Sequence, residues 1–263
     1  MAAGSLVPDE LDSELARIKH AIRESPAAPE HRIAYFQLLC IKGDWERAND
    51  QLKIVEEVAP ASALFAQVYS RAILCELERA KVFAGDGDPV IFGEPAEWLA
   101  HLIEAFRRGR SGDWDAASKA QALAFEAAPV TKGSLNDHAI EWVADADSRL
   151  GPVLEAFIEG HYRWIPFDRI SKLTIPEPSH QIDKVWVPAK FVWTNRGSAD
   201  GLIPVRYFGS EATGSTAMKS ASLTEWVEPA PGIYTGLGQR LITSDIQEVG
   251  LLDVRELNLE GES

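Results

Sequence analysis

The sequence predicts an α+β protein in which a tetratricopeptide-like layer of paired helices is followed by a small, mostly antiparallel β domain. Three observations support this prediction. Apolar residues recur at helical spacing up to about Tyr162, a helix–turn–helix motif occurs twice, and the remaining chain is rich in short β-branched and aromatic runs. Runs of helices followed by runs of strands favour α+β over alternating βαβ units. We therefore expect a helical domain over residues 1–160 and a β-rich domain over residues 161–263.

The N-terminal part contains seven predicted helices. In the first helix, one face carries apolar residues spaced by four and three positions, namely Leu11, Leu15, Ile18 and Ile22. Pro26 ends this helix, because the residue before a proline avoids helical backbone angles. The further helices are expected at Glu30–Ile41, Trp45–Val58, Ala61–Phe83, Ala96–Arg107, Trp114–Ala127 and Ala139–Glu159.

A helix–turn–helix motif occurs twice in this part. The string GDWERANDQLKIVEEVAP over residues 43–60 matches GDWDAASKAQALAFEAAP over residues 112–129 at seven of 18 positions, and the copies lie 69 residues apart. This offset is close to two tetratricopeptide units of about 34 residues. In each copy, glycine and aspartate form a turn and tryptophan opens the second helix. We therefore expect Gly43–Asp44 and Gly112–Asp113 to occupy equivalent turns.

The repeat is not regular along the whole helical part. Phe36 stands where a tetratricopeptide unit normally has a small residue, and the stretch Ala63–Ala96 has no GDW string of its own. One long helix and the loop AGDGDPVIFGEP replace a regular middle unit. The sequence therefore predicts paired helices but no regular superhelix.

The pattern changes after Tyr162 to short strands. The segments RWIPFDRISKLTI, WVPAKFVW, LIPVRYF, QRLITSD and VGLLDVREL are rich in β-branched and aromatic residues. TNRGSADG and TSDIQE are typical of hairpin turns between such strands. Seven prolines between residues 166 and 231 keep the strands short. We expect these strands to form a sheet that packs on the helical layer.

The charge and the cysteines indicate the class of partner and the compartment. The net charge of −14 argues against nucleic acid as a partner, since such proteins need a basic surface. Residues 1–160 carry 27 acidic and 16 basic residues, a net charge of −11, and the rest carries −3. The sequence has no apolar run of 18 residues and no signal peptide, so we expect no membrane span. Cys40 and Cys75 lie within helical patterns as reduced thiols, which favours the cytoplasm.

Motifs of catalysis are weak throughout. The six histidines are scattered without metal-ligand spacing, so no metal and no cofactor is expected. GLGQR at residues 236–240 lacks the third glycine of a dinucleotide-binding loop and favours a turn into a strand. Glu141, Asp145 and Asp147 form an acidic cluster that could serve a hydrolase or a metal-dependent enzyme, which is the alternative function. The four-residue spacing of Asp145 and Arg149 favours instead an ordinary helical ion pair.

Several long strings resemble the ImpE/TagJ family of bacterial type VI secretion accessory proteins, also described as SciE-type virulence proteins. They are FQLLCIKGDWERANDQL, IFGEPAEWLAHLIEAF, EWVADADSRLGPVLEAFIEGHYRWIPFDRI and GLGQRLITSD, and together they cover nearly the whole chain. Residues 199–224 are less similar. The resemblance implies a non-catalytic cytoplasmic adaptor that binds the small sheath subunit and the ATPase that disassembles the contracted sheath.

Paired helices can present a groove that accepts a partner helix. On the tetratricopeptide template, the positions that face this groove are Ile33, Gln37, Cys40, Leu99, Leu102 and Phe106. We expect these residues to contact a helix of the sheath subunit, although each of them also fits a place in the core.

Overall fold

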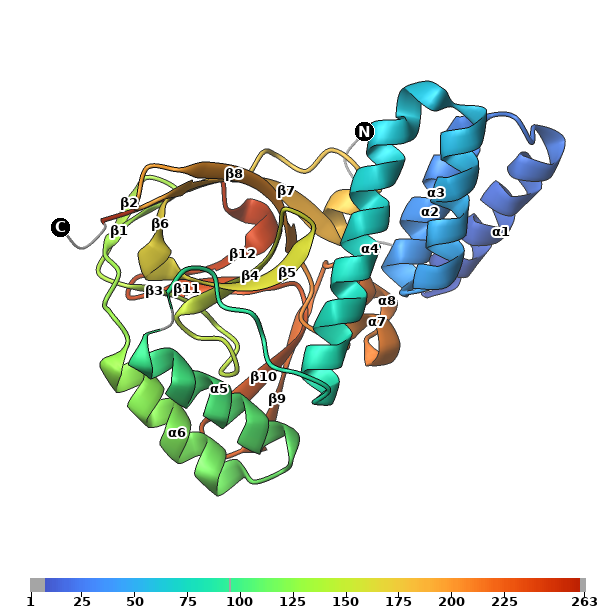
Figure 1. The fold of residues 1–263 in the computed structure, drawn as a ribbon. Helices are drawn as coiled ribbons and strands as arrows, with labels where there is room; N and C mark the ends of the chain where they lie inside the picture. The colour runs from blue at the N-terminus through green and yellow to red at the C-terminus, as the bar shows by residue number, and fades with distance from the viewer. Residues whose placement is uncertain (1–7, 95, 261–263) are drawn as a thin grey trace.

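The computed structural model describes residues 8–94 and 96–260. Its first four helices follow one another as packed neighbours, with α1–α3 on one side of the long α4 (Figure 1). Two further helices, α5 and α6, form a separate hairpin on the other side of α4. The bounds of the helices are α1 Pro8–Glu24, α2 Pro29–Lys42, α3 Trp45–Val58, α4 Ala63–Ala84, α5 Glu97–Arg110 and α6 Trp114–Ala127. None of the described helices combines the length and the apolar composition needed to cross a membrane.

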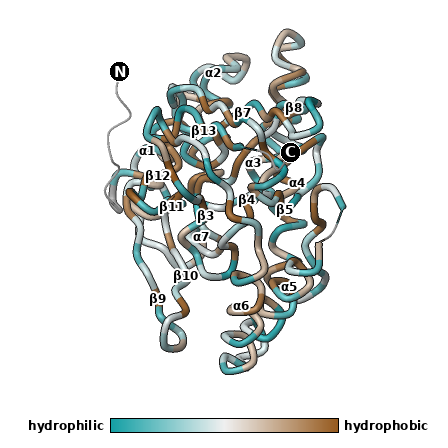
Figure 2. The backbone as a smooth tube through the Cα atoms, turned by 90° about the vertical axis from the view of Figure 1, so that its left-hand side faces the viewer, coloured by the Kyte–Doolittle hydropathy of each residue, from teal (hydrophilic) through white to brown (hydrophobic). Residues whose placement is uncertain are grey.

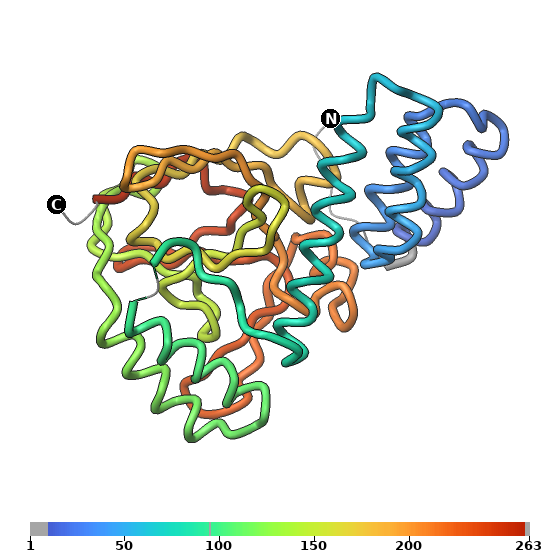
Figure 3. Tube along the Cα trace, viewed as in Figure 1, coloured from blue at the N-terminus to red at the C-terminus, as the bar shows by residue number. Residues whose placement is uncertain are grey.

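An antiparallel sheet of eight strands follows the helices. Its strand order is β2-β1-β13-β6-β7-β8-β4-β5, and these strands pair with one another in antiparallel fashion. The trace of Figure 3 shows the sheet curling around an interior, with α4 against its outside. The strands are β1 Gly133–Leu135, β2 His138–Ile140, β4 Val153–Ile158, β5 His161–Pro166, β6 Ile170–Thr174, β7 Trp186–Trp193, β8 Ser198–Pro204 and β13 Glu256–Leu259.

Two smaller sheets complete the C-terminal part. One has the order β12-β11-β3, with β3 at Val143–Asp145, β11 at Leu241–Ser244 and β12 at Glu248–Gly250. The other is a hairpin of β9 Thr224–Ala230 and β10 Ile233–Gly238, which extends toward α5 and α6 (Figure 1). Two short helices, α7 Ser210–Thr213 and α8 Thr216–Lys219, lie between β8 and β9. Four short 3-10 turns connect other elements, at Pro60–Ser62, Phe167–Arg169, Gln181–Lys184 and Leu251–Asp253.

The predicted helix at Ala139–Glu159 is wrong. These residues form β2, β3 and β4, so the last helix of this part ends at Ala127 and the first strand begins at Gly133, well before residue 160. The run VLEAFI of β4 is buried on both faces, and a two-sided apolar run cannot be told from a buried helix by its pattern. Gly151, with a φ of 53°, marks the turn that precedes β4.

Strand β4 lies between two hydrophobic cores. Val153 and Phe157 belong to a core shared with the helices, whereas Leu154, Ala156 and Ile158 belong to a core enclosed by the sheet. This alternation follows from the two-residue period of a strand. Along α5 and α6, brown and teal segments alternate in Figure 2, as expected for helices with one buried face. The fold therefore fixes the helices to the sheet through β4.

Candidate protein-binding surface and a buried charge network

The two GDW turns are equivalent in structure. Gly43 and Gly112 both have a left-handed backbone, with φ values of 81° and 79°. Asp44 and Asp113 then cap the following helices, because each side chain accepts a hydrogen bond from a backbone N–H three residues later, at 3.3 Å in both turns. The backbone N–H of each aspartate donates to the carbonyl five residues earlier, at 2.9 and 3.0 Å. The internal repeat therefore gives two matching helical hairpins, α2–α3 and α5–α6.

The first three predicted groove residues lie on α2. Ile33 and Gln37 are half-buried, so part of each side chain remains accessible to a partner. Cys40 is fully buried in the core that the helices share with the sheet. Burial raises the pKa of the Cys40 thiol well above its ordinary value, so this thiol is a packing residue in the present structure.

The other three predicted groove residues lie on α5. Leu99 and Leu102 are fully buried in the same core. Phe106 is 4% exposed and packs edge-on against Trp164, with ring centroids 5.2 Å apart. The two sets of three lie on hairpins on different sides of α4 and do not meet in one open groove (Figure 1). A partner-binding role for these six residues stays a prediction, and Ile33 and Gln37 are the two with the most accessible surface.

The acidic cluster is split by the fold. Glu141 is exposed and pairs with Lys132, whereas Asp145 and Asp147 are buried. The expected helical ion pair between Asp145 and Arg149 is wrong, because this segment is a strand and a turn. Arg149 instead pairs with Asp147, to which its Nε donates at 2.9 Å.

Asp145 and Asp147 are each held by several donors. Asp145 forms an ion pair with Arg240 and accepts hydrogen bonds from the Asp147 backbone N–H at 2.9 Å and from the Tyr207 hydroxyl at 3.1 Å. Asp147 also accepts from the backbone N–H groups of Arg149 and Gly236, both at 2.8 Å. Donors from three segments, at residues 147–149, 207 and 236–240, therefore converge on these two carboxylates.

A second group of charges joins α4 to the sheet. Arg79 of α4 donates from Nε and Nη2 to the two carboxylate oxygens of Glu155, at 2.8 and 2.9 Å, in a bidentate pair. Arg240 pairs with the same carboxylate and so links it to Asp145. The side chains of Glu155, Arg240 and Asp145 are 0% exposed. We refer to Arg79, Asp145, Asp147, Arg149, Glu155 and Arg240 as the buried charge network.

The aromatic residues of this region extend the network. The indole N–H of Trp164 donates to the hydroxyl of Tyr162 at 2.6 Å, and that hydroxyl donates to Glu155. On α4, Glu76 accepts a hydrogen bond from the indole N–H of Trp186 at 2.9 Å. Because these polar groups are buried, each hydrogen bond satisfies an atom that water cannot reach.

The two carboxyl groups at the centre have pKa values shifted in opposite directions. Burial would raise the pKa of Glu155, but Arg79 and Arg240 outweigh it and hold this pKa at about 2. For Asp145, burial prevails over the favourable charge of Arg240 and raises the pKa to about 6. Both groups are therefore ionised at neutral pH, and their charges are matched by arginines.

The two buried residues of the acidic cluster, Asp145 and Asp147, both belong to the buried charge network. A cavity of about 400 Å³ lies beside β3 and has Asp145 among its lining residues, yet the Asp145 carboxylate itself is 0% exposed. Within residues 8–94 and 96–260, no group of three metal-ligating side chains is found. The buried charge network holds α4 against β4 and against the turn before β11.

The predicted sites did not include Arg79, Glu155 or Arg240. Glu155 and Arg240 stand in the strings VLEAFI and GLGQR, where a single charge occurs within an apolar or glycine-rich run. A charge in such a place is the available signal, because a buried charge must have a partner. The sequence does not reveal which charges pair with Glu155, because Arg79 lies 76 residues away from it and Arg240 lies 85 residues away.

These features define an α+β protein in which paired helices are fixed to a curved antiparallel sheet by buried ion pairs. A model of the ImpE protein family matches residues 137–258, the segment that supplies Asp145, Glu155 and Arg240. The type VI secretion system accessory component TagJ of Pseudomonas aeruginosa is 40% identical over 250 residues, which cover 95% of this chain and 88% of TagJ. The chain belongs to the ImpE/TagJ family, as its sequence strings indicated.

A solved structure has the same fold. The crystal structure of a Vibrio parahaemolyticus protein matches this chain with a TM-score of 0.85 and 26% sequence identity. The match covers 96% of this chain and 95% of the other. The predicted α+β class, with helices followed by an antiparallel sheet, is confirmed.

Proposed function

We propose that this protein is a non-catalytic cytoplasmic adaptor of the type VI secretion system, which binds a helix of the small sheath subunit and also the sheath-disassembling ATPase. The observation that carries the proposal is the 40% identity to TagJ across 95% of the chain. TagJ is an accessory component of the type VI secretion system, which supports an accessory role for this protein. The sheath subunit and the ATPase are the partners that the family resemblance implies.

The outer face of α4 is the surface best suited to a partner helix. Leu64 is 74% exposed, and Val68, Leu74 and Leu77 are between 44% and 47% exposed. A cavity of about 520 Å³ lies between α4 and the loops and strands of the sheet, with Val68 among its lining residues. Several exposed apolar residues on one element are typical of an interaction site.

The negative charge of the helical part also supports the binding of a partner protein. The net charge of −11 on residues 1–160 would attract a basic partner and raise the association rate more than the affinity. Apolar anchors spaced by three and four residues on the partner helix would supply most of the affinity. Added salt should therefore slow association more than it speeds dissociation.

Titration of the purified protein with fragments of the small sheath subunit tests the proposal. We expect one helical fragment to bind with a Kd below about 100 μM, equivalent to roughly 5.5 kcal/mol. Leu64→Glu should weaken this binding at least tenfold, whereas Leu123→Glu on α6, a residue that is 51% exposed, serves as the matched control. If no fragment binds below 100 μM, the sheath-adaptor function is rejected and the ATPase is tested next.

A further inference from the structure

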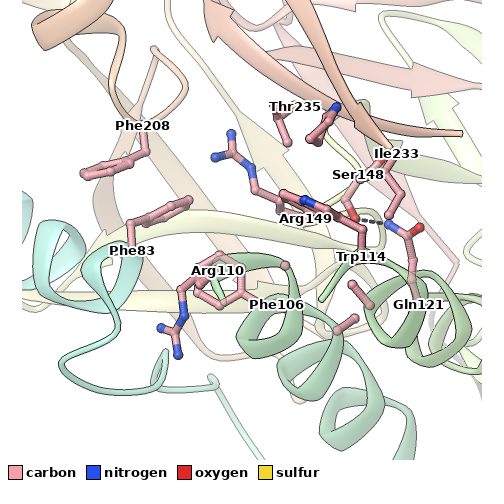
Figure 4. Close-up of a pocket in the computed structure, with 14 residues that line it drawn as sticks. Phe83, Phe106, Arg110, Trp114, Gln121, Ser148, Arg149, Phe208, Ile233 and Thr235 are labelled. Carbon is pink, nitrogen blue, oxygen red and sulfur yellow. Dashed lines mark hydrogen bonds between the residues drawn. The ribbon is translucent and has the colours of Figure 1, made fainter. Parts of the chain in front are cut away.

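A second cavity, of about 340 Å³, lies between the α5–α6 hairpin and the β9–β10 hairpin (Figure 4). Three aromatic residues form one side of it. Phe83 stacks on Phe208 with ring centroids 4.4 Å apart and meets Phe106 edge-on at 5.1 Å. The volume falls within the range of ligand-binding cavities. This cavity is separate from the outer face of α4.

The charged side chains that line this cavity are both arginines. The described residues that line it include Arg110 and Arg149 but no aspartate or glutamate, although the chain as a whole has a net charge of −14. The guanidinium of Arg110 lies 4.9 Å from the centre of the Phe106 ring and donates to the backbone carbonyls of Val82 and Gly87. Arg149 is already paired with Asp147, whereas Arg110 has no carboxylate partner among the described residues, so Arg110 is the group that favours a negatively charged occupant.

The internal repeat shows what kind of group fits against such a hairpin. In the α2–α3 hairpin, Trp45 is covered by Trp186 of β7, with ring centroids 5.5 Å apart and an interplanar angle of 29°. Trp114 is the equivalent residue of the α5–α6 hairpin, but in the described part of the chain no aromatic ring stacks on it. It lines the cavity instead, as Arg149 also does (Figure 4). The first hairpin is therefore already occupied by an aromatic side chain from another element, and the second is not.

We propose that this cavity receives an aromatic side chain flanked by carboxylates, supplied by a segment of a partner protein. The aromatic ring would cover Trp114 as Trp186 covers Trp45, and a flanking carboxylate would approach Arg110. This inference goes beyond the proposed function, because it concerns another surface and does not depend on the sheath subunit.

Synthetic peptides test the proposal with the full-length protein. The probe is fluorescein-labelled Ser-Asp-Trp-Asp-Ser, followed by fluorescence anisotropy. The controls are Ser-Asp-Ala-Asp-Ser, which lacks the ring, and Ser-Lys-Trp-Lys-Ser, which reverses the charge. We expect both controls to bind at least tenfold more weakly than the probe. Equal binding of the lysine peptide would overturn the proposal, and so would equally tight binding of free indole-3-propionate, which would indicate a small-molecule site.

Two variants locate the binding. Arg110→Gln should weaken probe binding about fivefold, the effect of losing one partly exposed ion pair. Arg108→Gln, on the same helix but outside the cavity, is the matched control and should leave binding unchanged. Thr235→Phe fills the cavity from β10 and should abolish binding.

Thermal denaturation shows whether each variant is folded. If Arg110→Gln does not fold, NMR of the wild-type protein decides, since the probe should shift the amide signals of Gly109 and Thr235. Unshifted signals at both residues would reject the cavity. These peptides contain no sheath sequence. The result of the peptide titration therefore stands whether or not the sheath fragments bind.

Discussion

Arg79 of α4 and Glu155 of β4 form a bidentate ion pair, with N–O distances of 2.8 and 2.9 Å, although 76 residues separate them in sequence. The Glu155 side chain is 0% exposed and that of Arg79 is 3% exposed. A buried pair of this kind costs desolvation free energy when it forms, but removal of one partner costs more, because the other charge is then left unpaired. The pair therefore fixes the position of α4 on the sheet.

We expect Glu155→Gln to destabilise the protein by about 3–5 kcal/mol, since Arg79 and Arg240 would lose their shared carboxylate. Urea denaturation followed by circular dichroism measures this loss. Asp88→Asn removes one partner of the exposed Arg107–Asp88 pair and should change the free energy of unfolding by no more than about 1 kcal/mol. Similar losses in the two variants would contradict the structural role of the network.

The pH dependence of stability should show two opposite contributions. Glu155 has a pKa of about 2, below its ordinary value of 4.5, so its stabilising contribution is present above pH 4.5 and is lost as the pH falls toward 2. Asp145 has a pKa of about 6, above its ordinary value of 3.8, so the folded state loses stability as the pH rises from 3.8 to 6. Each contribution is on the order of 3 kcal/mol.

Urea midpoints measured from pH 2 to pH 7 separate the two groups. Asp145→Asn should remove the decline between pH 3.8 and 6, and Glu155→Gln should remove the loss between pH 4.5 and 2, whatever the overall stability of each variant. Curves parallel to the wild-type curve in both variants would show that these carboxyl groups titrate normally.

Trp45→Ala should destabilise the protein by about 3–5 kcal/mol, because this indole stacks on Trp186. Trp114→Ala should cost less, since the Trp114 ring borders a cavity. Thermal denaturation measures both losses. Trp142→Ala, at a residue that is 38% exposed, is the control and should have the smallest effect. Unchanged melting temperatures in the first two variants would show that neither tryptophan supports its hairpin.

The glycines of the two GDW turns should differ in their tolerance of alanine. Both have a left-handed backbone, so alanine strains either turn by roughly 1–2 kcal/mol. At Gly43 an added Cβ would also lie 2.7 Å from Glu211, whereas at Gly112 it would meet no atom within 4 Å. We expect the larger loss of unfolding free energy for Gly43→Ala. Equal losses would indicate that backbone strain alone governs both turns.

The sequence predicted the features that depend on neighbouring residues. The GDW turns were found because a turn, an N-cap and a helix start are set within a few residues, and both copies show the same hydrogen bonds. The α+β class was found because helical and strand periodicity are local patterns. The groove residues Leu99 and Leu102 could not be separated from core residues in this way, since both roles require the same apolar face.

Features that depend on distant residues were missed. The sequence pattern predicts a helix at β4 because the helices cover one face of this strand and the sheet core covers the other, which removes the alternation that marks a strand. The ion pair of Asp145 was assigned to Arg149, four residues away, whereas its actual partner, Arg240, lies 95 residues away. Such pairings are decided by the topology of the sheet and not by spacing along the chain.

The two-sided burial of β4 also determines how the molecule should respond to force and to truncation. Both faces of β4 are buried, one by the helices and one by the sheet core, so neither part can unfold without exposing this strand. We therefore expect the helices and the sheet to unfold in one cooperative transition. A fragment that begins at residue 128 would expose to water the face of β4 that the helices cover, with Val153 and Phe157, and should aggregate. For a partner bound to α4, the same arrangement means that a pull on the helix is transmitted through Arg79 and Glu155 directly into the sheet.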